Sequence, residues 1–213
     1  MKRWILMLLL LWSAAAHANC VVGATGVVGT GTCSQAGMIL IAQQTASSSA
    51  NLAFTGANFV NTYNRLQLLC TLVLSAAGNI YVDVGTGATP TWQQTSYGVS
   101  GIYFSYVNGS TMTVYGSANG EVSLVGGLGS DVAVPANLEI TINNPGSTTY
   151  AKSAIWNVSQ ISSGEILRNV GTGQWTGGAT TPLTGLQVIP GSTGPGVGGL
   201  TFSSGECSLY GMP

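Results

Sequence analysis

From Met38 onward the sequence consists of short β-favouring runs separated by turn-forming residues. Branched and aromatic residues dominate runs such as "RLQLLCTLVL" and "NLEITINN", while glycine, asparagine, serine and proline lie between the runs. No stretch keeps apolar residues at the i, i+3, i+4, i+7 spacing of an amphipathic helix over three turns. Many short strands with frequent turn signals are typical of sandwiches and jelly rolls. We therefore predict an all-β fold, an antiparallel, jelly-roll-like β-sandwich over residues 38–213.

Some strands and turns can be placed within this domain. The segment "RLQLLCTLVLSAAGNIYVDVG" predicts two strands, Leu66–Leu74 and Ile80–Val84, on either side of a turn at 76–79. The segment "SANG", Ser117–Gly120, is typical of an Asn-Gly hairpin turn.

Residues 1–18 have the pattern of a secretory signal peptide. Lys2 and Arg3 precede an apolar run, Trp4–Trp12, and small residues lead to an A-x-A site that ends at Ala18. The run is much shorter than the ~20 residues of a membrane span, so we expect a cleaved signal helix and no membrane span after cleavage. This predicts export through a Sec-type pathway to the periplasm, the extracellular space or a virion surface.

The exported part contains four cysteines and begins with a glycine-rich extension, residues 19–37. An even number of cysteines outside the cytosol favours disulfides, and three pairings are possible. We favour Cys20–Cys33, which brackets the glycine-rich stretch. The second pair would then be Cys70–Cys207, which joins an early strand to the last one.

Loss of the signal peptide leaves a chain that is very poor in charge. Its cations are Arg65, Lys152 and Arg168, and it contains no histidine. Three scattered cations cannot neutralise a row of phosphates, so nucleic acid is not an expected partner. A metal site, a cofactor and a histidine-based nucleophile are not expected either. Low charge offers little electrostatic protection to strand edges, which predicts a homo-oligomer.

Six segments in order give the chain a likeness to a known group of proteins. They are "QTASSSANLAFTG" (44–56), "TYNRLQLL" (62–69), "LEITINNPGS" (138–147), "VGTGQWTGG" (170–178), "LTGLQVIP" (183–190) and the terminal "LTFSSGECSLYGMP" (200–213). In this order and spacing, with the closing "SLYG", the chain resembles phage virion structural proteins, notably tail and appendage proteins. The resemblance implies a β-sandwich that serves as a structural or host-facing module, without catalytic residues. An exported prophage product and a bacterial secreted protein built on the same fold are both compatible with it.

The sequence also suggests where the last strand lies and how its side chains point. In a Greek-key sandwich the final strand can lie inside the sheet, paired on both sides. If Leu209 faces the core, strand alternation places Ser208 and Tyr210 on the opposite face.

Aromatic residues in polar segments suggest a second function, carbohydrate binding by a secreted adhesin. Trp92, Tyr97 and Trp175 lie among glycine, threonine and glutamine, where an exposed ring could stack on a sugar. Alternatively, each tryptophan packs on the core or in a subunit contact. Trp156, in "AIWNVSQ", is expected to be structural.

A third alternative is glycoside hydrolysis by a pair of carboxylates. Glu165 and Glu206 are the candidates, together with Asp83, although Asp83 fits a solvent-facing strand residue better. The leading hypothesis remains an exported, non-enzymatic protein that works by presenting a surface to a glycan, a virion partner or a cell surface.

Overall fold

The computed structural model of the chain describes residues 22–23, 26–27, 37–56, 63–106, 110–121, 125–130, 134–162, 165–178 and 180–213. The chain divides into two units, residues 1–35 and residues 36–213. In the first unit the described part is an antiparallel pair, β1 (Val22–Gly23) and β2 (Gly26–Val27). The predicted signal peptide, Cys20 and Cys33 lie outside the described residues.

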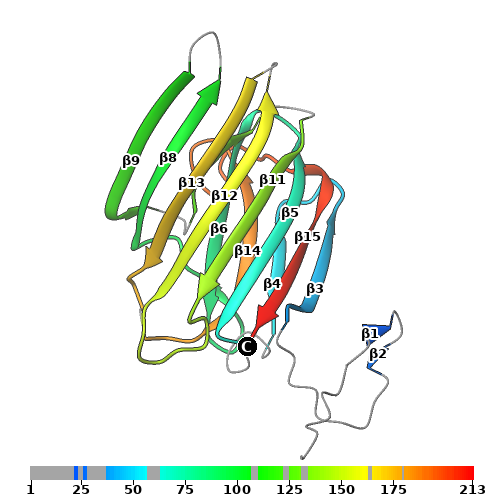
Figure 1. Cartoon of the computed structure of the whole chain (residues 1–213), viewed down its shortest axis with the longest axis vertical. Helices are drawn as coiled ribbons and strands as arrows, with labels where there is room; N and C mark the ends of the chain where they lie inside the picture. The colour runs from blue at the N-terminus through cyan, green and yellow to red at the C-terminus, as the bar shows by residue number, and fades with distance from the viewer. Residues whose placement is uncertain are drawn as a thin grey trace, which may run out of the picture. The chain divides into compact units, whose positions relative to one another are not determined.

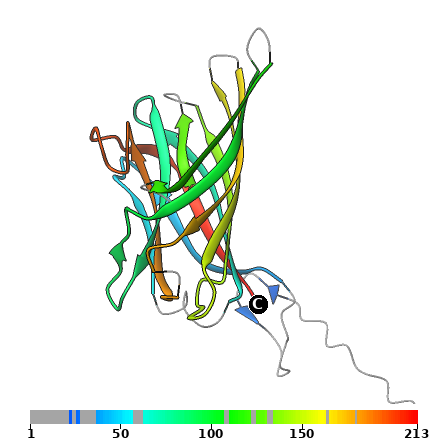
Figure 2. The same cartoon turned by 90° about the vertical axis from the view of Figure 1, so that its left-hand side faces the viewer.

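The second unit is a sandwich of two antiparallel sheets (Figures 1 and 2). The large sheet contains, in spatial order, β3 (Ile39–Ala46), β15 (Phe202–Met212), β5 (Arg65–Leu74), β11 (Ala136–Asn143), β12 (Lys152–Ser162), β13 (Glu165–Trp175), β8 (Tyr97–Tyr106) and β9 (Ser110–Glu121). The small sheet contains β10 (Val125–Ser130), β6 (Gly78–Thr86), β14 (Leu183–Gly191) and β4 (Leu52–Thr55), with β7 (Thr91–Trp92) also paired to β6. The predicted all-β sandwich is confirmed. Within the described part of the chain, no helix has the length and hydropathy that a membrane span requires.

The two strands predicted from one segment are confirmed as β5 and β6, and the turn between them lies at 75–77. The hairpin turn predicted at Ser117–Gly120 is wrong, because these residues lie within β9. There the pairing of β9 with β8 shifts register: Ser117 lies opposite Val99, and Glu121 lies opposite Tyr97. The Asn-Gly pair therefore lies in a bulged part of a strand, a place where unusual backbone angles are also tolerated.

β15 lies inside the large sheet, hydrogen-bonded to β3 on one side and to β5 on the other. Figure 1 shows it, in red, between these two strands. Leu209 is completely buried, whereas Ser208 and Tyr210 are half-buried on the other face of the sheet. The prediction of an interior final strand with Leu209 facing the core is confirmed.

A disulfide joins β15 to β5. Cys70 and Cys207 lie directly opposite each other in the register of these strands, and both are buried. This bridge was one of the two predicted from the sequence, and it is confirmed. It closes a loop between residues 137 positions apart.

The core lies between the sheets and is built from aligned apolar side chains. One row crosses four strands of the large sheet and consists of Leu209, Leu68, Ile140 and Trp156. Alternation with a period of two places these residues on one face, where they meet the apolar face of β6 and β14.

Trp156 is a structural residue, as predicted. Its ring lies over Gly171, where an added Cβ would come within 2.4 Å of the indole. The indole Nε1 donates a hydrogen bond of 2.9 Å to Oδ1 of Asn169, which is also buried. Glycine at 171 thus leaves space for the largest side chain of the core.

Removal of the disulfide should destabilise the domain strongly. By chain-entropy arithmetic, a ring of this size contributes about 5 kcal/mol. We expect the Cys70→Ala/Cys207→Ala variant to lose about 2–5 kcal/mol of unfolding free energy in guanidinium titrations without reductant. Reductant should lower the stability of the wild type toward that of the variant. Equal midpoints for the two proteins under non-reducing conditions would show that this bridge does not stabilise the domain.

Candidate functional site

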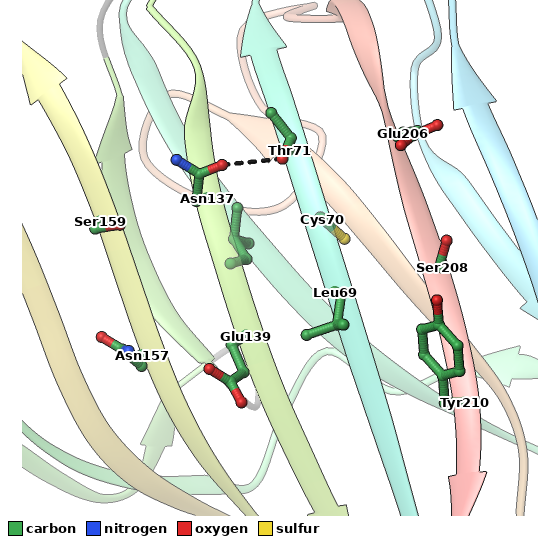
Figure 3. A pocket seen from close by; sticks show the side chains of 11 residues that line it. Leu69, Cys70, Thr71, Asn137, Glu139, Asn157, Ser159, Glu206, Ser208 and Tyr210 are labelled. Atoms are coloured by element: carbon green, nitrogen blue, oxygen red, sulfur yellow. Dashed lines mark hydrogen bonds between the residues drawn. The ribbon is translucent and has the colours of Figure 1, made fainter. Parts of the chain in front are cut away.

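The outer face of the large sheet carries a shallow hollow of about 420 Å³. It crosses β15, β5, β11 and β12 (Figure 3). Its lining is mostly polar: Leu69, Cys70, Thr71, Asn137, Leu138, Glu139, Asn157, Ser159, Glu206, Ser208 and Tyr210.

The same alternation that builds the core places these polar side chains outside. In β11, buried residues alternate with more exposed ones, and Asn137 and Glu139 are among the exposed positions. The register then aligns the strands into rows. One row runs Glu206, Thr71, Asn137, Ser159, and the next runs Ser208, Leu69, Glu139, Asn157.

Neighbouring side chains hold several of these groups in place. Oδ1 of Asn137 accepts a hydrogen bond of 2.9 Å from the Thr71 hydroxyl. Oδ1 of Asn157 accepts one of 3.0 Å from Nε of Arg168. Oε1 of Glu139 accepts one of 2.8 Å from Nε2 of Gln67. These bonds fix which edge of each group faces outward.

The two carboxylates of the hollow are turned to different partners. Oε2 of Glu206 accepts a hydrogen bond from Gln43, on the neighbouring strand β3, whereas Glu139 is bonded to Gln67 on β5. Figure 3 shows Glu206 directed away from β5 and Glu139 on the far side of that strand. Such diverging groups suit the binding of separate parts of a ligand better than joint attack on one bond.

The aromatic residues predicted to bind sugar are largely built into the fold. Trp175 ends β13 and is only 3% exposed, with its ring against Gly177 and Gly178. Of the two alternatives for Trp175, packing on the core is therefore correct, and an exposed loop position is not. Gly177 and Gly178 make room for the indole.

Trp92 is half-buried in the short strand β7. Its ring covers Gly85 and Gly185, which lie opposite each other in β6 and β14, so that a Cβ on either would come within 3 Å of the indole. Trp92 therefore packs against the outer face of the small sheet and does not lie near the hollow of the large sheet.

Tyr97 is completely buried, which is incompatible with stacking on a ligand. Its hydroxyl donates a hydrogen bond of 2.8 Å to the Gln93 carbonyl and accepts one of 3.1 Å from the Val84 amide. Burial raises the pKa of Tyr97 well above its usual value, and the nearby charge of Asp83 acts in the same direction.

The expectation that Asp83 faces solvent is wrong, because Asp83 is completely buried. Gln187, opposite it on β14, and Gln94, from the segment after β7, each place an amide nitrogen 3.5 Å from Oδ2 of Asp83. The segment after β7 thus contributes to the covering of a sheet face that alternation alone would leave in water.

The two carboxylates proposed as a catalytic pair lie on strands that are far apart in the large sheet. Glu165 begins β13 and Glu206 lies on β15, four strands away. Four inter-strand spacings amount to about 19 Å, too far for two carboxylates to act on one glycosidic bond.

Among the described residues, no group of three or more histidine, cysteine, aspartate or glutamate side chains could hold a metal ion. Comparison with protein-family models, with curated proteins and with solved structures finds no match to this chain.

Removal of the buried hydroxyl of Tyr97 tests how the segment after β7 is held against β6. Tyr97→Phe leaves the Val84 amide and the Gln93 carbonyl unpaired and should cost about 1–3 kcal/mol of unfolding free energy. Because folding raises the pKa of Tyr97, wild-type stability should fall as pH rises above about 10, since the unfolded state releases the proton first.

Urea titrations between about pH 8 and about pH 11 should show a flatter alkaline limb for Tyr97→Phe than for the wild type. Tyr150→Phe is the matched control, since Tyr150 is 67% exposed. An alkaline limb that Tyr97→Phe leaves unchanged would argue against this role of the phenol.

Proposed function

We propose that this chain is an exported, non-enzymatic, jelly-roll-like module that works by surface contact, similar in role to phage tail and appendage proteins. Support comes above all from the outer face of the large sheet, which extends across eight hydrogen-bonded strands. Glu165 and Glu206 lie on strands far apart in the large sheet, and Asp83 is buried. The three carboxylates considered for hydrolysis therefore do not form a common site. The buried disulfide fits an oxidising compartment, because such bridges persist mainly outside the cytosol.

The outer face has two chemically different parts. The hollow forms the polar part. From Asn157 the register leads through Val170 to Ile102, and the side chains become apolar. We call Ile102, Phe104, Met112 and Val114 the apolar strip; they form two cross-strand pairs at the β9 edge.

The apolar strip favours contact between two copies of the chain. Phe104, Met112 and Val114 are 39%, 64% and 68% exposed. Within the part of the chain that the structure describes, β9 has one hydrogen-bonded neighbour, β8. Its 12 residues include no lysine, arginine or proline. An unprotected edge of this kind pairs readily with another strand, and an antiparallel pair of identical edges is self-complementary about a twofold axis. In our proposal, two copies associate through β9.

Sedimentation of the Val114→Lys variant tests this contact. We expect the wild type to self-associate, and we expect the variant to shift to monomer because a charged side chain on an edge strand opposes its pairing with a second edge. Thr172→Lys, on the same face in β13, should leave association unchanged. A wild type that stays strictly monomeric at high concentration would rule out the contact.

Export is tested by intact mass spectrometry of the protein made from the full-length gene. The exported fraction should lack residues 1–18 and should contain no free thiol, because Cys20–Cys33 and Cys70–Cys207 are both expected to form. Peptide mapping without reduction identifies the pairs. Full-length protein retained in the cytosol with reduced cysteines would contradict the proposed compartment.

A further inference from the structure

We propose that the hollow on the outer face of the large sheet is a binding site for a neutral oligosaccharide. This inference rests on the proposed contact function and names the ligand of the polar part of that face. The sugar-binding groups in this inference are those around Asn137 and Glu139. They take the place of Trp92, Tyr97 and Trp175, which are largely packed into the fold.

The rigidity of the hollow distinguishes it from an ordinary exposed sheet surface. Its four strands, β15, β5, β11 and β12, are interior strands, each hydrogen-bonded to a neighbour on both sides. The disulfide ties the first two of them together directly below this face. Sites held on rigid elements lose less entropy when a ligand binds.

The hydrogen-bonding groups of the hollow are oriented before any ligand arrives. The amide oxygens of Asn137 and Asn157 are occupied by Thr71 and Arg168, so their amide nitrogens remain as donors. Glu139 keeps its second oxygen as an acceptor, since Gln67 bonds to the first. Donors and acceptors at fixed positions match hydroxyl groups, which both donate and accept.

Hydroxyl groups and an aromatic ring complete the lining. Ser159, Ser208 and Tyr210 make no side-chain hydrogen bond to any of the described residues. In Figure 3 the Tyr210 hydroxyl points along β15 toward Ser208. A tyrosine ring offers an apolar face to the C–H groups of a sugar and a hydroxyl to its polar edge.

Size and charge favour a neutral saccharide over other ligand classes. The volume of about 420 Å³ lies within the range of small-molecule sites, and three strand spacings give a width of about 14 Å. The two carboxylates, Glu139 and Glu206, disfavour an anionic ligand. The two carboxylates bond to different partners and do not converge on a common point for a cation. The described residues contain no group of three or more metal-ligating side chains. An apolar ligand would leave the polar lining unpaired.

A glycan array followed by calorimetry with soluble oligosaccharides tests the site on the exported wild-type protein. We expect binding of neutral oligosaccharides. Asn137→Ala and Glu139→Gln should each weaken binding about tenfold or more. The first removes the amide donor, and the second replaces the acceptor oxygen of Glu139 with an amide donor. Both residues are exposed, and circular dichroism checks that the variants fold.

Gln174→Ala is the matched control, since Gln174 is an exposed amide on β13 outside the hollow. Binding should persist in EDTA and change little with sodium chloride. An array without hits overturns the inference, as does equal loss of binding in the control. Binding of oligolysine that falls steeply with salt, or a requirement for added Ca²⁺, would identify a basic peptide or a cation as the ligand and would also overturn it.

The outcome for the site can be separated from the outcome for the proposed function. The same preparation is examined by sedimentation and intact mass. An exported, self-associating protein that binds no glycan overturns only the saccharide site. A reduced, cytosolic monomer overturns the proposed function itself.

Discussion

The pairing of the last strand between β3 and β5 is the interaction on which the rest of the domain depends. β15 completes the large sheet, adds Leu209 to the buried row of the core and brings Cys207 opposite Cys70. It also supplies one wall of the polar hollow through Ser208 and Tyr210. Without this strand β5 would be a sheet edge, and both the core and the hollow would lose one side. A chain so poor in charge relies on ladders of backbone hydrogen bonds and on apolar burial, and β15 contributes to both.

The large sheet carries different chemistry on its two faces and along its width. Its inner face is mostly apolar, with the buried Asn169 bonded to Trp156, while its outer face changes from amides, hydroxyls and carboxylates around β11 to exposed apolar residues on β8 and β9. This division fits a protein that binds one partner through the middle of the sheet and associates with a second copy at its edge. The small sheet is covered differently, because Trp92 and Gln94 pack over its outer face.

The aromatic residues show where local sequence context misleads. Trp175 and Trp92 lie near glycines, which suggested exposed loops, but these glycines leave space for the indole rings. Asp83 alternates with apolar residues and so indicated a solvent-facing position. The segment after β7 returns over that face, however, and its Gln94 lies beside the carboxylate together with Gln187 of β14. For Trp92 and Asp83, the distant strand β14 supplies part of the environment, through Gly185 and Gln187.

The sequence alone determined the all-β class and the strands β5 and β6, and among three possible cysteine pairings it favoured the one that includes Cys70–Cys207. These follow from a period of two along each strand and from the few cysteines available, and both can be read locally. Only the tertiary structure decided that Glu206, Asn137 and Asn157 share one hollow, that Glu165 lies far from Glu206, and that Tyr97 is buried. The physical reason is that alternation assigns a side chain to a face, whereas strand order and loop coverage depend on pairings between residues far apart in the chain.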